Sequence, residues 1–268
     1  MKIAFCLAGD PRDFGYIWGD FLSKVTPSGC EIDFYVHNWI RDPIGEPGGE
    51  KENSGAGLRA QVSSFEYLKV VRPVRAVLEI YEASQVFRDF GNAIDPLRCR
   101  SYSMFYGIQH AFQVIQNPSR YDLIIRCRPD VFFEQPLDFV SMVNALSIDS
   151  SPAAVFLDLF VNPGAQPTHP TTGWGSWTPD GAFIQDFFWA FRPSLLPAFS
   201  CIYDEMTWLC ADFNGSDIHS DVPGRWLYIQ EFFLRKWLRY RGIRPIKFPE
   251  KMLLARHHKV LFEGGVFI

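Results

Sequence analysis

The sequence lacks any uninterrupted apolar run near the roughly 20 residues that a membrane-spanning helix needs. The segment Met1–Gly9 is too short for the apolar region of a signal peptide and has no basic stretch followed by a cleavage site. Any membrane association is therefore expected to be peripheral. A cytoplasmic location is expected from the cysteines described below.

The sequence also lacks an excess of basic residues over acidic residues. The chain has 26 Lys and Arg against 30 Asp and Glu, for a net charge of -4, which argues against a general nucleic-acid surface. Lys and Arg concentrate near the C-terminus. They form either a solvated helix face or a contact for an anionic membrane surface or anionic substrate. They are Arg235, Lys236, Arg239, Arg241, Arg244 and Lys247.

The six cysteines form no Cys-x-x-Cys pair and no metal-ligand spacing. Several lie in apolar runs, which is typical of small buried core residues and of a reducing compartment. The cysteines are Cys6, Cys30, Cys99, Cys127, Cys201 and Cys210.

What the chain does have is 47% hydrophobic residues among 268, enough for a large core. Strand patterns alternate with helix patterns through the first half, which predicts an α/β fold with a mostly parallel central sheet flanked by helices. We expect one domain over 1–268, with a nucleotide-binding half (1–135) and an acceptor-side half (136–268). Expected strands are 2–8, 31–37, 74–81, 123–127, 154–160, 243–248 and 253–255, and expected helices are 14–24, 101–116, 137–146, 195–209 and 228–240.

The most informative segment is Tyr121-Asp-Leu-Ile-Ile-Arg-Cys-Arg-Pro-Asp130. Its apolar run predicts a buried strand that ends at Pro129, which has no N–H for a ladder, while Asp122 caps the opposite end. Ligands bind at the carboxyl ends of strands in open α/β sheets. Arginines there suit phosphate oxygens, and a carboxylate suits a metal ion or a sugar hydroxyl. Arg126 and Arg128 share one face of the strand, so each must pair with an acidic group or bind a phosphate.

The loop after the first strand, Leu7-Ala-Gly-Asp-Pro-Arg-Asp-Phe14, is neither Gly-x-Gly-x-x-Gly nor a Walker P-loop. Gly9 allows close backbone approach to a ligand, and Arg12 could reach a phosphate. A simple β–α turn is the alternative. The polar stretch 41–57 suits either a lid or an ordinary surface insertion.

Other candidates lie further along the chain. Asp186, in apolar surroundings, suits a general base or hydroxyl acceptor, or else an exposed loop position. Glu231 opens an amphipathic helix, and the helix dipole alone favours a carboxylate at this position. The functional alternative for Glu231 is acceptor binding or base catalysis. Of the adjacent His257 and His258, at most one faces a given site, and a surface pair is the alternative.

Together these residues resemble nucleotide-sugar glycosyltransferases of the GT-A fold, and more narrowly small bacterial and viral enzymes of lipopolysaccharide and capsule loci, including the WavE-like group. The matching features span most of the chain, and only the Arg-Pro-Asp segment is specific. They are Leu7 to Arg12, Asp33 to His37 (Asp-x-x-x-His), Tyr102 to Met104 (Tyr-Ser-Met), Tyr121 to Asp130, Gln185 to Phe188 (Gln-Asp-Phe-Phe), and Gln230 with Glu231.

The resemblance implies transfer of a sugar from a nucleotide diphosphate donor, with UDP-sugars favoured, to a glycan or lipid-linked acceptor in polysaccharide biosynthesis. The donor would be held by Ala8, Gly9, Arg12, Tyr102, Ser103, Arg126, Arg128 and Asp130. Asp186 would be the base of an inverting reaction, with Glu231 as competitor, while a retaining reaction needs no such base.

In the GT-A fold the segment is usually Asp-x-Asp, which holds a divalent metal against the diphosphate. Here the first Asp is replaced by Arg128, which could neutralise phosphate charge directly. If a metal binds, Asp130 with His257 or His258 would hold Mn²⁺ or Mg²⁺.

Two other functions remain open. A sugar nucleotidyltransferase of similar topology usually shows a Gly-rich N-terminal signature with a basic residue, which Gly9 to Arg12 match poorly. A non-catalytic glycan-binding module would use Trp174 and Trp177 to stack on sugar faces.

Overall fold

A computed structural model describes residues 1–9, 14–27, 29–40, 64–80, 84, 88, 96–133, 135–159, 187–209 and 229–254. The strands are β1 (Lys2–Ala8), β2 (Glu31–Ile40), β3 (Arg75–Ile80), β4 (Leu123–Cys127), β5 (Val131–Phe133), β6 (Ala153–Leu159), β7 (Phe188–Phe191) and β8 (Arg244–Leu254). The helices are α1 (Phe14–Val25), α2 (Ser64–Val71), α4 (Pro96–Gln113), α5 (Phe139–Ala145), α6 (Leu196–Phe199), α7 (Ile202–Leu209) and α8 (Ile229–Tyr240).

The eight strands form one sheet in the order β3-β2-β1-β4-β7-β6-β8-β5. Strands β3, β2, β1 and β4 run parallel, β7 is antiparallel to both of its neighbours, β6 and β8 are parallel, and β5 is antiparallel to β8. The predicted α/β class with a mostly parallel sheet is confirmed.

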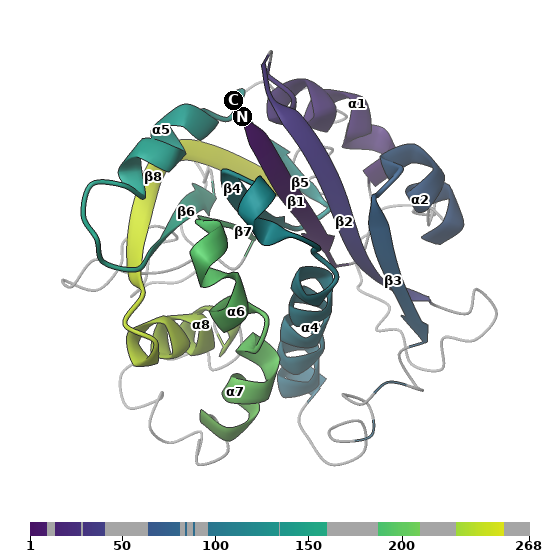
Figure 1. Ribbon diagram of the computed structural model, residues 1–268. Coiled ribbons are helices and arrows are strands. Elements are labelled where there is room, and N and C mark those ends of the chain that lie inside the picture. The colour runs from purple at the N-terminus through teal and green to yellow at the C-terminus, as the bar shows by residue number, and fades with distance from the viewer. Residues whose placement is uncertain are drawn as a thin grey trace, which may run out of the picture.

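Helices cover both faces of the sheet (Figure 1). Alternation along β1 sends Ile3, Phe5 and Leu7 into a core with residues of α1, α2 and α5. Ala4 and Cys6 point the other way, into a core shared with α4, α6, α7 and α8. Because both faces of β1 are covered, the strand reads as an almost continuous apolar run.

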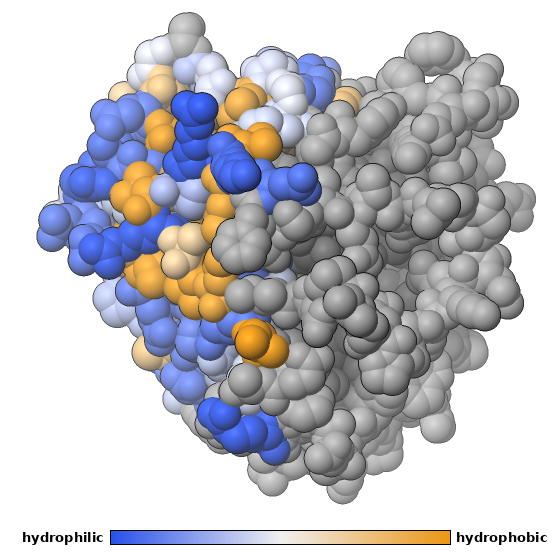
Figure 2. Space-filling model, turned by 90° about the vertical axis from the view of Figure 1, so that its right-hand side faces the viewer, coloured by the Kyte–Doolittle hydropathy of each residue, from blue (hydrophilic) through white to orange (hydrophobic). Residues whose placement is uncertain are grey.

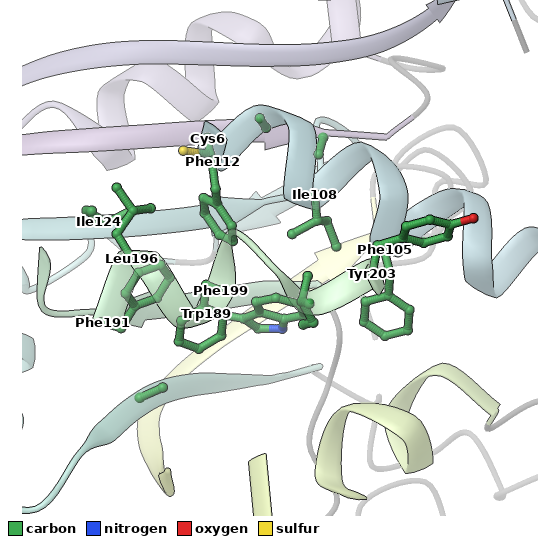
Figure 3. Close-up of a cluster of buried hydrophobic side chains, with 14 of the residues drawn as sticks. Cys6, Phe105, Ile108, Phe112, Ile124, Trp189, Phe191, Leu196, Phe199 and Tyr203 are labelled. Atoms are coloured by element: carbon green, nitrogen blue, oxygen red, sulfur yellow. The ribbon is translucent and has the colours of Figure 1, made fainter. Parts of the chain in front are cut away.

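The second of these cores is rich in aromatic rings, several of which are drawn in Figure 3. Phe191 and Phe199 stack with ring centroids 4.0 Å apart, and Trp189 lies 5.8 Å from Phe199. Phe112 of α4 meets Phe191 edge to face at 5.3 Å. These contacts fix α4 and α6 against the centre of the sheet.

Helix α4 approaches β2 very closely at Gly107. A Cβ at this position would lie 2.7 Å from Nδ1 of His37, a separation that real Cβ atoms do not show. Glycine is therefore required here by space, and its absence of a side chain sets the distance between helix and sheet.

Two expected elements differ in the structure. The helix expected over 195–209 is divided into α6 and α7 by a turn at Ser200 and Cys201. The two strands expected at 243–248 and 253–255 form the single strand β8. Its register with β6 jumps from Leu157↔Phe248 to Asp158↔Lys251, and the extra residues include Pro249, which cannot donate to a ladder.

Several minor expectations are confirmed. Asp122 caps the start of the sheet, because its Oδ2 accepts the Lys2 N–H at 2.7 Å. Cys6 and Cys127 are buried free thiols. The basic side chains of α8 and β8 form a solvated face, since Lys236, Arg239, Arg241, Arg244 and Lys247 are exposed.

The side of the molecule that carries α2 and β3 shows apolar surface between hydrophilic residues (Figure 2). The exposed apolar side chains of this region include Val70 on α2, Val74, and Ile80 on β3. Among the described helices none is long and apolar enough to cross a membrane.

Candidate functional site

The candidate site lies where the strand order changes direction. From β1 the chain moves outward to β2 and β3, then returns through α4 to place β4 on the other side of β1. The loops after β1 and β4 therefore diverge from adjacent strand ends, with Leu7 paired to Cys127. Such a switch point leaves a crevice at the carboxyl edge in which ligands bind.

Gly9 and Pro129 bring these two loops together. Gly9 has a φ of +135°, and a Cβ there would lie 3.4 Å from Cδ of Pro129. The backbone of Gly9 thus lies close to the side chains of Pro129 and Arg128, in a conformation that favours glycine. Arg12 lies outside the described residues.

Arg128 and Asp130 form a bidentate ion pair across Pro129. Nε of Arg128 donates to Oδ1 at 2.8 Å, and Nη2 donates to Oδ2 at 2.7 Å. The Asp130 side chain is only 3% exposed, while that of Arg128 is 24% exposed. The carboxylate is therefore enclosed, while the arginine side chain that pairs with it is partly exposed.

Phe187, which directly precedes β7, supports the arginine. The guanidinium carbon lies 4.7 Å from the Phe187 ring centroid, and the Arg128 N–H donates to the Phe187 carbonyl at 3.0 Å. Sequence reasoning gave Phe187 no role. Its only signal was the Gln-Asp-Phe-Phe segment, whose position beside β4 depends on an antiparallel pairing that the sequence does not reveal.

Arg126 is placed differently from Arg128. It is fully buried in β4, and its guanidinium carbon lies 5.2 Å from the ring centroid of Trp189, its partner across the β4–β7 ladder. Its side chain has no solvent-exposed surface. Arg126 and Arg128 were both expected to hold the donor, and only Arg128 reaches the surface of the site.

The remaining predicted donor-binding residues lie on β1 and α4. Ala8 is 1% exposed and ends β1, so its backbone is what it can offer to a ligand. Tyr102 is buried in the same core cluster as Ala8, while Ser103 is half-buried on α4. The structure therefore brings Ala8, Gly9, Arg128 and Asp130 to one edge, with Tyr102 packed inside.

A second polar cluster lies at the same edge of the sheet, and sequence reasoning gave it no role. His37 pairs in register with Ala8 and is buried, and its Nε2 lies 2.9 Å from Oε2 of Glu79. The Tyr106 hydroxyl donates to Oε1 of Glu79 at 3.0 Å, and Nδ1 of His110 lies 3.4 Å from Oε2. The sequence signal was the Asp-x-x-x-His segment of β2.

Burial and mutual contacts shift the pKa values of this cluster. Burial alone would raise the pKa of Glu79, but the hydrogen bonds from His37 and Tyr106 and the charge of His110 outweigh it, so the pKa is lowered. Burial and the contact with Glu79 raise the pKa of Tyr106 to about 12. Burial lowers the pKa of His110. At neutral pH Glu79 is therefore the ionised centre of the cluster.

Some predicted residues cannot be placed. Asp186, His257 and His258 lie outside the described residues. Glu231 lies in the first turn of α8, as predicted, and its side chain is outside the description.

The described residues do not by themselves make up a metal site, and the expected ligands His257 and His258 lie outside them. The described residues contain no group of three or more His, Cys, Asp or Glu side chains that could hold a metal ion. Asp130, the carboxylate expected to do so, accepts hydrogen bonds from Arg128 on both oxygens. Divalent Mn²⁺ and Mg²⁺ need several oxygen ligands, so this carboxylate alone does not make such a site.

No family model and no curated protein matches this sequence. Among solved structures, the chain is similar to mouse xyloside xylosyltransferase 1 in its apo form, with 9% identity, a TM-score of 0.48, and 92% of this chain and 85% of that chain covered. It is also similar to the galactosyltransferase LgtC in complex with donor and acceptor sugar analogues, with 14% identity, a TM-score of 0.44, and coverage of 91% and 73%. An active-site mutant of LgtC is similar to the chain with 15% identity and a TM-score of 0.44, and 91% of this chain and 72% of that chain are covered. At these values the likeness is distant.

Proposed function

We propose that this protein is a GT-A-like glycosyltransferase that moves a sugar from a nucleotide diphosphate donor, with UDP-sugars favoured, to a glycan or lipid-linked acceptor. The observation that carries the proposal is the position of Arg128. It is a partly exposed arginine side chain just after the carboxyl end of β4, beside Gly9 at the switch point of a mostly parallel sheet.

This arrangement suits the pyrophosphate of a nucleotide-sugar. A phosphate oxygen accepts strong, directional hydrogen bonds from a guanidinium, and the glycine loop lets backbone N–H groups approach the same oxygens. The nucleotide would lie along the ends of β1 and β4, with Ala8, Gly9 and Arg12 on one side of it. The sugar would project toward the C-terminal half of the chain.

In the proposed reaction an acceptor hydroxyl attacks the anomeric carbon of the donor sugar. The bond from that carbon to the phosphate oxygen breaks, and the nucleoside diphosphate leaves with the electron pair. Arg128 would stabilise the negative charge that develops on the leaving phosphate. In an inverting reaction Asp186 would take the hydroxyl proton, with Glu231 as the competing base.

A donor panel tests this proposal. The full chain is incubated with UDP-, GDP- and dTDP-sugars, and thermal unfolding and donor hydrolysis are followed with and without Mn²⁺. We expect at least one nucleotide-sugar to raise the unfolding temperature and to be slowly hydrolysed, because a ligand that binds only the folded state stabilises it. Absence of stabilisation by every nucleotide would overturn the proposal.

Two control arms separate the alternatives. Release of pyrophosphate from a nucleoside triphosphate and a sugar 1-phosphate would identify a nucleotidyltransferase instead. Stabilisation by free oligosaccharides without any nucleotide effect would identify a glycan-binding module. In either case the transferase assignment fails.

A further inference from the structure

We infer that Asp130 is a positioning residue for Arg128, and that this edge takes the donor diphosphate with the guanidinium and without a divalent metal ion. The inference rests on the proposed function and names how the same site holds its ligand. It differs from the expectation that Asp130 touches a metal or the donor sugar.

The first step is the pairing itself. Both carboxylate oxygens of Asp130 accept from Arg128, at 2.8 and 2.7 Å, and the carboxylate is almost completely enclosed. A metal ion on these oxygens would lie beside the positive guanidinium, and the two cations would repel each other. Moving the guanidinium away would break two charge-assisted hydrogen bonds in a buried place.

The Arg128 side chain is held from more than one side. The Nε and Nη2 edge faces Asp130, the ring of Phe187 lies 4.7 Å from the guanidinium carbon, and the backbone N–H is bonded to the Phe187 carbonyl. Gly9 packs against Pro129 and Arg128 from the adjacent loop. A long side chain that is fixed before the ligand arrives loses less rotamer entropy on binding.

Arg128, held in this way, is suited to recognise a diphosphate. An arginine side chain that is fixed in direction and 24% exposed can present N–H groups at a set angle, which suits the paired oxygens of a diphosphate. It supplies the positive charge that a metal would otherwise supply to the leaving phosphate. Asp130 thus affects the ligand only through the orientation of Arg128.

A double-mutant cycle with UDP as the probe tests this inference. UDP affinity is measured by titration calorimetry for the wild type, Arg128→Gln, Asp130→Asn and the double variant, in EDTA and again in excess Mn²⁺. Uridine, which has no phosphate, is titrated in parallel. Arg244→Gln and Asp149→Asn are matched controls, since they remove the two halves of an exposed Arg–Asp pair (Nη2 to Oδ2, 2.9 Å) elsewhere on the molecule.

The expected results are specific. UDP affinity is the same in EDTA and Mn²⁺ within about twofold. Arg128→Gln lowers it roughly 10- to 100-fold, and Asp130→Asn lowers it about tenfold, the scale on which an orienting partner acts. In the Arg128→Gln background, Asp130→Asn has no further effect beyond about twofold. Uridine affinity and both control variants are unchanged.

Three outcomes would overturn the inference. The first is UDP binding that needs Mn²⁺ in the wild type. The second is an Asp130→Asn variant with wild-type affinity, and the third is independent, additive losses in the double variant. If UDP, GDP and dTDP all fail to bind under every condition, the proposed function itself fails, which is a separate result.

Asp130 is buried, so its substitution could prevent folding, which circular dichroism would reveal. Arg128→Lys on the native Asp130 then carries the test. It keeps the charge and loses the two-point contact, and we expect a UDP affinity well below that of the wild type in EDTA, with no recovery in Mn²⁺. Recovery in Mn²⁺ would contradict the inference.

Discussion

The two ends of the same parallel strands carry charged clusters of different construction. At the amino end, Asp33 of β2 accepts from the Tyr121 hydroxyl at 2.6 Å and from Arg120, and lies 3.5 Å from Nζ of Lys2. The hydroxyls of Tyr121 and Tyr35 lie 2.7 Å apart. These bonds join β1, β2 and the start of β4, which are far apart in the sequence.

At the carboxyl end the pairing is local. Arg128 and Asp130 are two residues apart in one loop, and Phe187 and Gly9 hold them from the adjacent segments. Such a pair can meet a ligand without separating one strand from another.

The difference indicates where stability and recognition reside in this sheet. Hydrogen bonds between distant segments at the amino end oppose unfolding, because breaking them frees whole strands. A prearranged group within one loop at the carboxyl end contributes less to the sheet and more to ligand binding. Substitutions at the two ends should therefore separate these two properties.

The largest effect is expected from Gly9→Ala. The positive φ strains any L side chain, at about 1–3 kcal/mol, and the new Cβ would meet Pro129 at 3.4 Å. We expect a lower free energy of unfolding together with a roughly 10- to 100-fold loss of nucleotide affinity, because Gly9, which is proposed to lie against the phosphates, is displaced. Chemical denaturation and titration calorimetry measure the two quantities.

Gly29→Ala is its matched control near the amino end. Gly29 also has a positive φ, of +87°, but a Cβ there would meet nothing within 4 Å. It should reduce stability and leave nucleotide affinity unchanged. Equal losses of affinity in the two variants would contradict the assignment of Gly9 to the site.

An intermediate effect is expected from Tyr121→Phe. Removing the hydroxyl deprives Asp33 and Tyr35 of a hydrogen-bond partner, which should cost about 1–3 kcal/mol in the free energy of unfolding. Urea denaturation measures this loss, and nucleotide affinity should not change. Tyr240→Phe, at a side chain that is 54% exposed, is the control and should be nearly neutral. A stable Tyr121→Phe variant with weakened nucleotide binding would reverse the comparison.

The smallest effect is expected for the contribution of Asp33 to stability at acidic pH. Burial alone would raise the pKa of Asp33, but the hydrogen bond from Tyr121 and the charges of Lys2 and Arg120 outweigh it and hold the pKa below its ordinary value. A carboxylate with a depressed folded-state pKa stabilises the protein above its unfolded pKa of about 3.9 and loses this contribution as the pH falls through the folded pKa.

Stability curves against pH check this expectation. Below pH 4 the free energy of unfolding of the wild type should fall more steeply than that of Asp33→Asn. The difference in free energy of unfolding between the two proteins should therefore become smaller. Parallel curves through that range would show that Asp33 has no such role.

Much of the fold was open to sequence reasoning because the pattern of β1 and β4 is strong. Both strands are buried on two faces, and Pro129 marks the end of the second, so the bounds of β4 match the prediction. Strand β7 was not assigned, since four aromatic and small residues after an irregular stretch have no period that separates strand from core helix. The single strand β8 was missed because Pro249 reads as a break, and a bulge absorbs it.

Part of the candidate site could be predicted from the sequence for the same reason. The approach of Gly9 to Pro129 follows from adjacent parallel strands that end together. That Arg128 turns back onto Asp130 could not be foreseen, because strict alternation in an extended chain does not describe the loop after β4. The Glu79 cluster was missed because it joins three elements whose proximity only the packed fold reveals.

The position of β8 has a consequence for the order in which the sheet is made. It is the last strand in chain order among the described residues, yet it lies inside the sheet, between β6 and β5, and pairs Leu254 with Val131. A nascent chain can assemble β3, β2, β1 and β4 once residue 127 has emerged, yet β5 and β6 keep open edges until residues 244–254 follow. During synthesis the strands from β1 to β4 thus precede the rest of the sheet, and the unpaired edges are where premature association between chains would begin.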